Sequence, residues 1–272
     1  MNKPEKIDKP LWHVSYAVIY AHIFVSVYGA HVFLKQKAYI LPELIFWIET
    51  ILAAILLMLM IVSMFRKKAS TLWWEVMLMI IAFAGVWIYF LSFLPISAAI
   101  LLSSIVTVSA FVWRAVYSMN LFYVFGCAGI GLLVVWHFLP SSIIFLALGV
   151  LVYDYYRSRE MKMAILYHDA RRSGLIPGFL LPVDIAGWMN SRIEVWNPGL
   201  GKIVSILPLM AAAAISFQLL IGYGETVFLF FCIFVMLFGF AYGLAKDYGL
   251  RGNIFLGTAI SVYVIIFLVD KL

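Results

Sequence analysis

The sequence predicts an all-α polytopic membrane protein with nine transmembrane helices, a cytoplasmic N-terminus and a C-terminus outside. Three observations lead to this prediction: the composition, the spacing of the apolar segments and the distribution of basic residues. Of the 272 residues, 65% are hydrophobic and 12% are charged, whereas a soluble domain carries about 25% charged residues. A soluble core of this size cannot bury so much apolar surface, so lipid must surround most of the side chains.

Nine apolar segments are long enough to cross a bilayer, since a transmembrane helix needs about 20 residues. They cover residues 11–34, 41–64, 72–93, 95–113, 119–138, 140–156, 203–222, 226–245 and 252–269. Charged residues, prolines or glycines separate them. The breaks lie at Lys35/Lys37, 66–68, Leu94-Pro95, Arg114, Leu139-Pro140, 157–201, 222–225 and 246–251.

The basic residues separate cleanly between the two sides that nine spans create. Of the 19 Lys and Arg residues, all but Lys35, Lys37 and Lys271 fall on the side of the N-terminus. Because cytoplasmic loops carry the excess of Lys and Arg, this side is predicted to be cytoplasmic. A basic cytoplasmic face also attracts anionic lipid headgroups, and nothing in the sequence calls for nucleic acid.

These boundaries divide the chain into three parts. Residues 1–156 form a six-helix membrane bundle, 157–201 a cytoplasmic or interfacial connector, and 203–272 a three-helix membrane portion. The connector contains an apolar patch, 176–183, and several arginines. It is expected to lie in the membrane interface, with its apolar face in lipid.

Asp154 is the clearest candidate for chemistry, because ionisable groups at membrane depth are costly and are often functional. It lies near the cytoplasmic end of the sixth segment. One interpretation is a catalytic carboxylate. The other is an interfacial carboxylate paired with Arg157 or Arg159.

No metal or cofactor site is predicted. His13, His22 and His31 follow one another at intervals of nine residues, which is about half a turn beyond a whole number of helical turns. Successive histidines therefore face opposite ways and cannot share a metal ion. The sequence also contains no phosphate-binding glycine loop and no motif of a zinc protease or serine hydrolase.

Two short motifs resemble the presenilin and signal-peptide-peptidase family of intramembrane aspartyl proteases. The first is Tyr153-Asp154, late in the sixth segment, and the second is Gly199-Leu200-Gly201, before the seventh. The nine-span plan, obtained independently from the charges, agrees with this resemblance. The motifs lie within about 150–215.

The resemblance implies two aspartates that share a proton, one acting as general base and the other as general acid. Asp154 corresponds to the first, but Lys202 occupies the position of the second, so the motif is Gly-Leu-Gly-Lys. An ammonium group would hold Asp154 as a carboxylate and abolish the shared proton. The family's Pro-Ala-Leu motif at the start of the ninth span is also missing, because the last proline is Pro208.

The favoured hypothesis is therefore a presenilin-like protein that has lost peptidase activity and binds transmembrane helices of client proteins. An active protease with a non-standard second acid, such as Asp184 or Glu194, stays open. So does an unrelated small transporter or channel, although no internal repeat is visible. The short loops favour a prokaryotic cell membrane.

Overall fold

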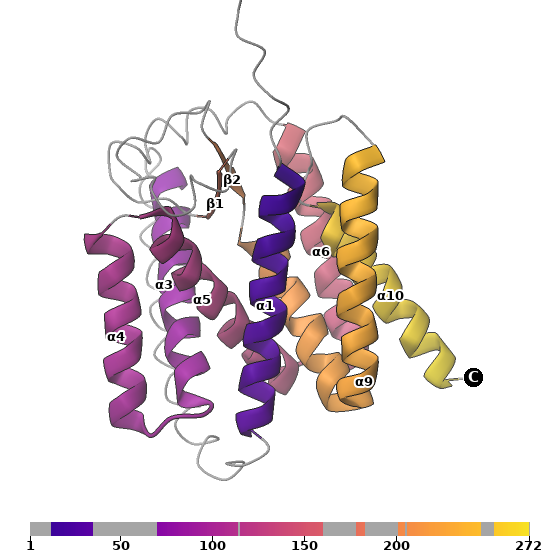
Figure 1. Cartoon of the computed structure of the whole chain (residues 1–272), viewed down its shortest axis with the longest axis horizontal. Helices are drawn as coiled ribbons and strands as arrows, with labels where there is room; N and C mark the ends of the chain where they lie inside the picture. Colours follow the sequence, from indigo (N-terminus) through magenta and orange to yellow (C-terminus); the bar gives the residue numbers. More distant parts are fainter. Residues whose placement is uncertain are drawn as a thin grey trace, which may run out of the picture.

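The computed structural model describes residues 12–34, 70–113, 115–159, 178–182, 201–204, 206–245 and 253–271. Within these residues the chain forms seven helices and one two-stranded sheet (Figure 1). In chain order the elements are α1 (Trp12–Leu34), α3 (Ser70–Leu91), α4 (Ile96–Val112), α5 (Val116–His137), α6 (Pro140–Arg159), β1 (Phe179–Pro182), β2 (Gly201–Val204), α9 (Leu207–Ala245) and α10 (Asn253–Lys271). The predicted second span, 41–64, lies outside the described residues.

The two uncharged breaks predicted from proline are confirmed. α4 starts directly after Pro95, whose φ of −63° and ψ of 152° are extended, and α6 starts at Pro140. Proline suits these positions because the first N–H groups of a helix have no partner within it, so the missing proline N–H costs nothing there.

α9 is a helical hairpin, as the predicted break at 222–225 requires. A straight helix of its 39 residues would be about 58 Å long, far more than the roughly 30 Å of the hydrocarbon core. Gly224 instead adopts φ 84° and ψ 179°, a conformation that residues with a Cβ atom rarely adopt. At this residue the chain turns back, and its second half returns along the bundle (Figure 1).

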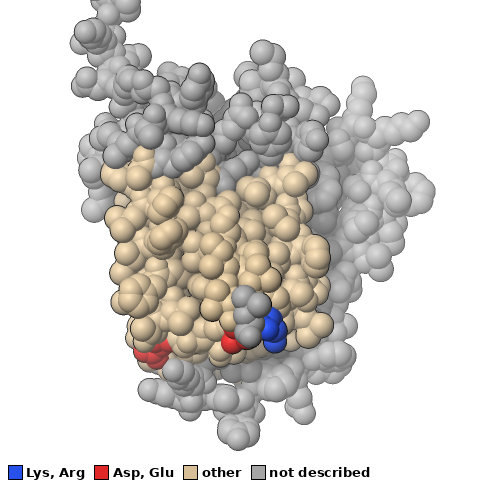
Figure 2. Space-filling model, turned by 90° about the vertical axis from the view of Figure 1, so that its right-hand side faces the viewer, with Lys and Arg blue, Asp and Glu red and all other residues tan. Residues whose placement is uncertain are grey.

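Four helical stretches of the described residues are long and apolar enough to cross a membrane. They are Val14–Val32, Val116–His137, Leu207–Ala241 and Ile254–Lys271. Figure 2 shows that the described side chains on the face formed by the right-hand side of Figure 1 are uncharged except at its lower edge. The prediction of a helical membrane protein is confirmed for this part of the chain.

α5 lies at the centre of the bundle and packs against α1, α3, α4 and α9. Glycines bring its backbone close to two of these helices. A Cβ on Gly126 would lie 2.7 Å from the carbonyl oxygen of Ala82 in α3, and a Cβ on Gly131 would lie 2.7 Å from the Cβ of Ala213 in α9. Small residues allow such close backbone approach, which gives helices in lipid their packing contacts.

The described residues are almost entirely helical, as predicted, and the short two-stranded sheet is an addition that was not predicted. β1 comes from the connector and pairs antiparallel with β2, in the region predicted as the start of the seventh helix. That helix begins at Leu207 and not at 203. Pro208 explains the later start, because its ring would collide with the carbonyl of Val204, four residues earlier, if both were helical.

Candidate functional site

Tyr153 and Asp154 lie in the last turns of α6, which ends at Arg159. Their side chains lie outside the described part of the structure. Gly199 and Leu200 lie outside it entirely. The interpretation of Asp154 as a catalytic or interfacial carboxylate therefore stays a prediction.

Gly201 and Lys202 form the first half of β2, and their backbone is paired with β1. Lys202 is opposite Leu181, and Gly201 is opposite Pro182. The ribbon lies at the same end of the bundle as the end of α6 (Figure 1). α6 also packs against α9, the helix that follows β2, so the helix carrying Asp154 contacts the helix that follows Lys202.

Asn120 of α5 attaches this ribbon to the bundle. Its Nδ2 donates a hydrogen bond of 2.7 Å to the carbonyl oxygen of Leu180, and the Leu180 N–H donates one of 2.8 Å to its Oδ1. Asn120 is only 2% exposed and Leu180 is completely buried. One amide side chain thus satisfies both polar groups of a buried residue in β1, each of which would be costly to leave unpaired.

A second contact joins α5 to the segment between β2 and α9. The Sγ of Cys127 donates to the carbonyl oxygen of Ile206 across 3.7 Å, and both residues are buried. Ile206 comes directly before α9. α5 therefore holds β1 at one point and the start of α9 at another.

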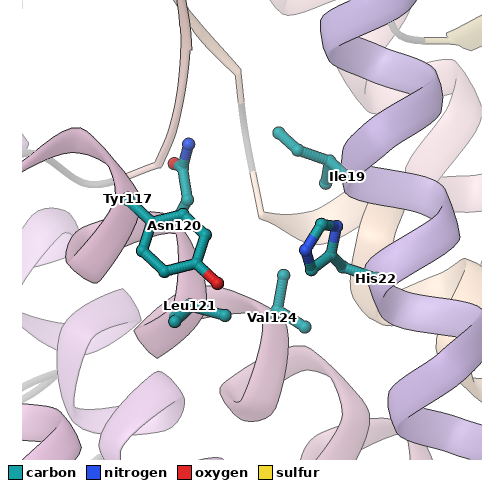
Figure 3. Close-up of a pocket in the computed structure, with 6 residues that line it drawn as sticks. All are labelled: Ile19, His22, Tyr117, Asn120, Leu121 and Val124. Carbon is teal, nitrogen blue, oxygen red and sulfur yellow. The ribbon is translucent and has the colours of Figure 1, made fainter. Parts of the chain in front are cut away.

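A small pocket lies beside this attachment, between α1 and α5. Its lining residues are Ile19, His22, Tyr117, Asn120, Leu121 and Val124 (Figure 3). Its volume is about 10 Å³, which is room for roughly one water molecule. The pocket is therefore too small to receive a substrate side chain.

His22 points from α1 toward this space (Figure 3). Its Nδ1 lies 2.7 Å from the carbonyl oxygen of Val18. A carbonyl oxygen can only accept, so Nδ1 is the donor in this hydrogen bond, which holds the ring against its own helix. Within the described residues, no group of three or more His, Cys, Asp or Glu side chains could hold a metal ion.

The turn of α9 contains Gly222-Tyr223-Gly224-Glu225, which imitates the family's glycine-acid pattern. Tyr28 of α1 donates a hydrogen bond of 3.3 Å to the Glu225 carboxylate. Figure 1 shows this turn at the end of the bundle opposite the ribbon. Glu225 is therefore far from Lys202 and cannot serve as the second acid beside Asp154.

Asn120 is the residue that sequence analysis missed. The signal available was a single amide in an otherwise apolar segment, where buried polar groups require partners. That signal identifies a polar contact but not its partner, which lies 60 residues away.

Comparison with protein-family models, with curated proteins and with solved structures finds no match to this chain.

Proposed function

We propose that this chain is a presenilin-like membrane protein that has lost peptidase chemistry and acts by binding transmembrane helices of other proteins. The observation that carries the proposal is the combination of Tyr153-Asp154 on α6 with Gly-Leu-Gly-Lys at 199–202, a few residues before α9. The packing of α6 against α9 supports it, because the two motifs can act together only if their helices are neighbours.

The chemistry follows from Lys202. An aspartyl protease needs two carboxylates that share one proton, so that one can activate water while the other protonates the leaving amine. A lysine near Asp154 favours the ionised carboxylate instead. In this proposal the two side chains form a partly buried ion pair, which is tolerable in the membrane because each charge has a partner.

The proposal includes nine spans, with the N-terminus in the cytoplasm of a prokaryotic cell. Two passes of α9, the six other described helices and the apolar segment 41–64 support that number. An odd number of spans puts the two termini on opposite sides. A reporter enzyme that works only outside the cytoplasm should be active when fused after Leu272, and its inactivity there would contradict the topology.

The activity is tested with purified protein in liposomes and a single-span substrate that carries a photo-crosslinker. Mass spectrometry follows cleavage, and crosslinking follows binding, for the wild type and for Asp154→Ala. We expect crosslinking without cleavage. Cleavage that disappears in Asp154→Ala would show an active protease with another second acid and overturn the proposal. If the wild type shows no cleavage and no crosslinking, the transporter hypothesis is favoured.

Lys202→Asp is the matched gain-of-function variant, because it restores the second carboxylate of the motif. Any cleavage in this variant should depend on Asp154, so Lys202→Asp combined with Asp154→Ala is its control. Lys202→Asn, which removes the ammonium group without adding an acid, should stay inactive.

A further inference from the structure

Asn120 of α5 bonds to the outer edge of β1 in the way that a neighbouring strand would. In an antiparallel pair, residues alternate between those whose N–H and C=O face the partner strand and those whose groups face away. Leu180 is opposite Ile203, yet both of its backbone groups bond to Asn120. They therefore face away from β2, and the Asn120 amide occupies the place that a third strand would take.

The burial of both partners shows why an amide is needed here. Leu180 is completely buried and Asn120 nearly so. An apolar side chain of similar size at 120 would leave one donor and one acceptor of Leu180 without partners in the protein interior. That loss is far more costly than the loss of a solvent-exposed hydrogen bond.

We propose that Asn120 is a positioning residue that fixes the β1–β2 ribbon, and with it Lys202, to the central helix α5. Lys202 pairs with Leu181, so the residue that Asn120 anchors, Leu180, is the chain neighbour of the residue that pairs with Lys202. The consequence for Lys202 rests on the proposed function. The anchoring itself does not, and it can be tested separately. The same amide closes the edge of β1 at Leu180 to any added strand.

The chemistry of the anchor suggests a distinctive variant. A protonated carboxylic acid both donates and accepts, as an amide does, whereas an ionised carboxylate only accepts. Asn120→Asp should therefore retain the anchor at low pH and lose it as the pH rises. Asn120→Leu should lose it at every pH.

The test is hydrogen exchange, measured by mass spectrometry on protein in nanodiscs, for a peptide covering β1. In Asn120→Leu, we expect β1 to exchange about tenfold faster or more, while a peptide from the first half of α9 keeps its protection. In Asn120→Asp, the exchange rate relative to wild type at the same pH should rise with pH. Ser118→Ala is the matched control, because its hydroxyl donates to the carbonyl oxygen of Ala115, the N-cap residue of α5, and not to the ribbon.

Unchanged exchange of β1 in Asn120→Leu would overturn the anchor, and so would an Asn120→Asp variant with the same ratio to wild type at every pH. If Asn120→Leu does not fold, the pH dependence of Asn120→Asp decides alone. Positioning of Lys202 is tested by client crosslinking in Asn120→Asp. We expect crosslinking to fall as the pH rises, relative to wild type at each pH. A constant ratio despite a released ribbon would contradict the positioning role but leave the anchor standing.

Discussion

The interface between α3 and α5 and the outer surface of α9 are both apolar but are built in opposite ways. At the interface, Gly85, Gly126 and Gly129 let the two backbones touch, so that a Cβ on Gly129 would lie 2.7 Å from the carbonyl carbon of Gly85. On the second half of α9, Phe234 and Phe238 stack with ring centroids 4.5 Å apart, and each is about half exposed.

This difference shows what distinguishes the inside of a membrane protein from its surface. In water, apolar side chains would be driven inward, but lipid tails accept a phenylalanine as readily as a protein core does. At the interface of α3 and α5, small residues and close backbone packing therefore mark the internal contact, and hydrophobicity does not. Apolar segments reveal that helices exist but not which of their faces meet.

Gly129→Ala should give the largest effect on stability. Its new Cβ would meet the backbone of Gly85, which cannot move aside as a flexible side chain can. We expect a loss of about 3 kcal/mol in the free energy of unfolding, measured by denaturant titration in mixed micelles. Gly149→Ala is the control, because a Cβ there meets no atom within 4 Å. It should be neutral or stabilising by up to about 1 kcal/mol, and equal losses in the two variants would refute the packing contrast.

Phe255→Leu compared with Phe234→Leu should give a smaller contrast between inside and surface. Phe255 of α10 is fully buried and stacks on Tyr20 of α1, with ring centroids 4.9 Å apart. Replacing the ring by a leucine leaves a gap that the neighbouring helices cannot fill. We expect the free energy of unfolding to fall by about 1.5 kcal/mol. Around Phe234, lipid can fill the space, so the change should stay within about 0.5 kcal/mol. Thermal unfolding in one detergent measures both, and a larger loss at Phe234 would contradict the account.

The features that could be predicted from the sequence are those with a local cause. Pro95 and Pro140 mark helix starts because they lack an N–H, and glycines within 222–225 mark the turn of α9. The ribbon escaped prediction because four-residue strands are too short to show alternation. Pro208 could nevertheless have shown that the helix does not include Val204, because a proline disfavours helical structure four residues before it. The partner of Asn120 could not be predicted, because no local pattern links residues 60 positions apart.

For the candidate site, the sequence provides the motif residues but not their contacts. Asp154 and Lys202 were identified from their neighbours along the chain. Whether their side chains meet depends on how α6 and the ribbon are oriented, which no residue spacing determines. The structure adds that α6 contacts α9 and that α5 holds the ribbon.

A double-mutant cycle on Asp154 and Lys202 tests whether an ion pair has replaced the catalytic pair. The free energy of unfolding is measured for wild type, Asp154→Asn, Lys202→Met and the double variant. The ion pair predicts that each single change costs more than the double change, with a coupling of about 1 kcal/mol or more. Single effects that add to the double effect within about 0.3 kcal/mol would show that the two side chains do not interact, and the proposed loss of the shared proton would lose its physical basis.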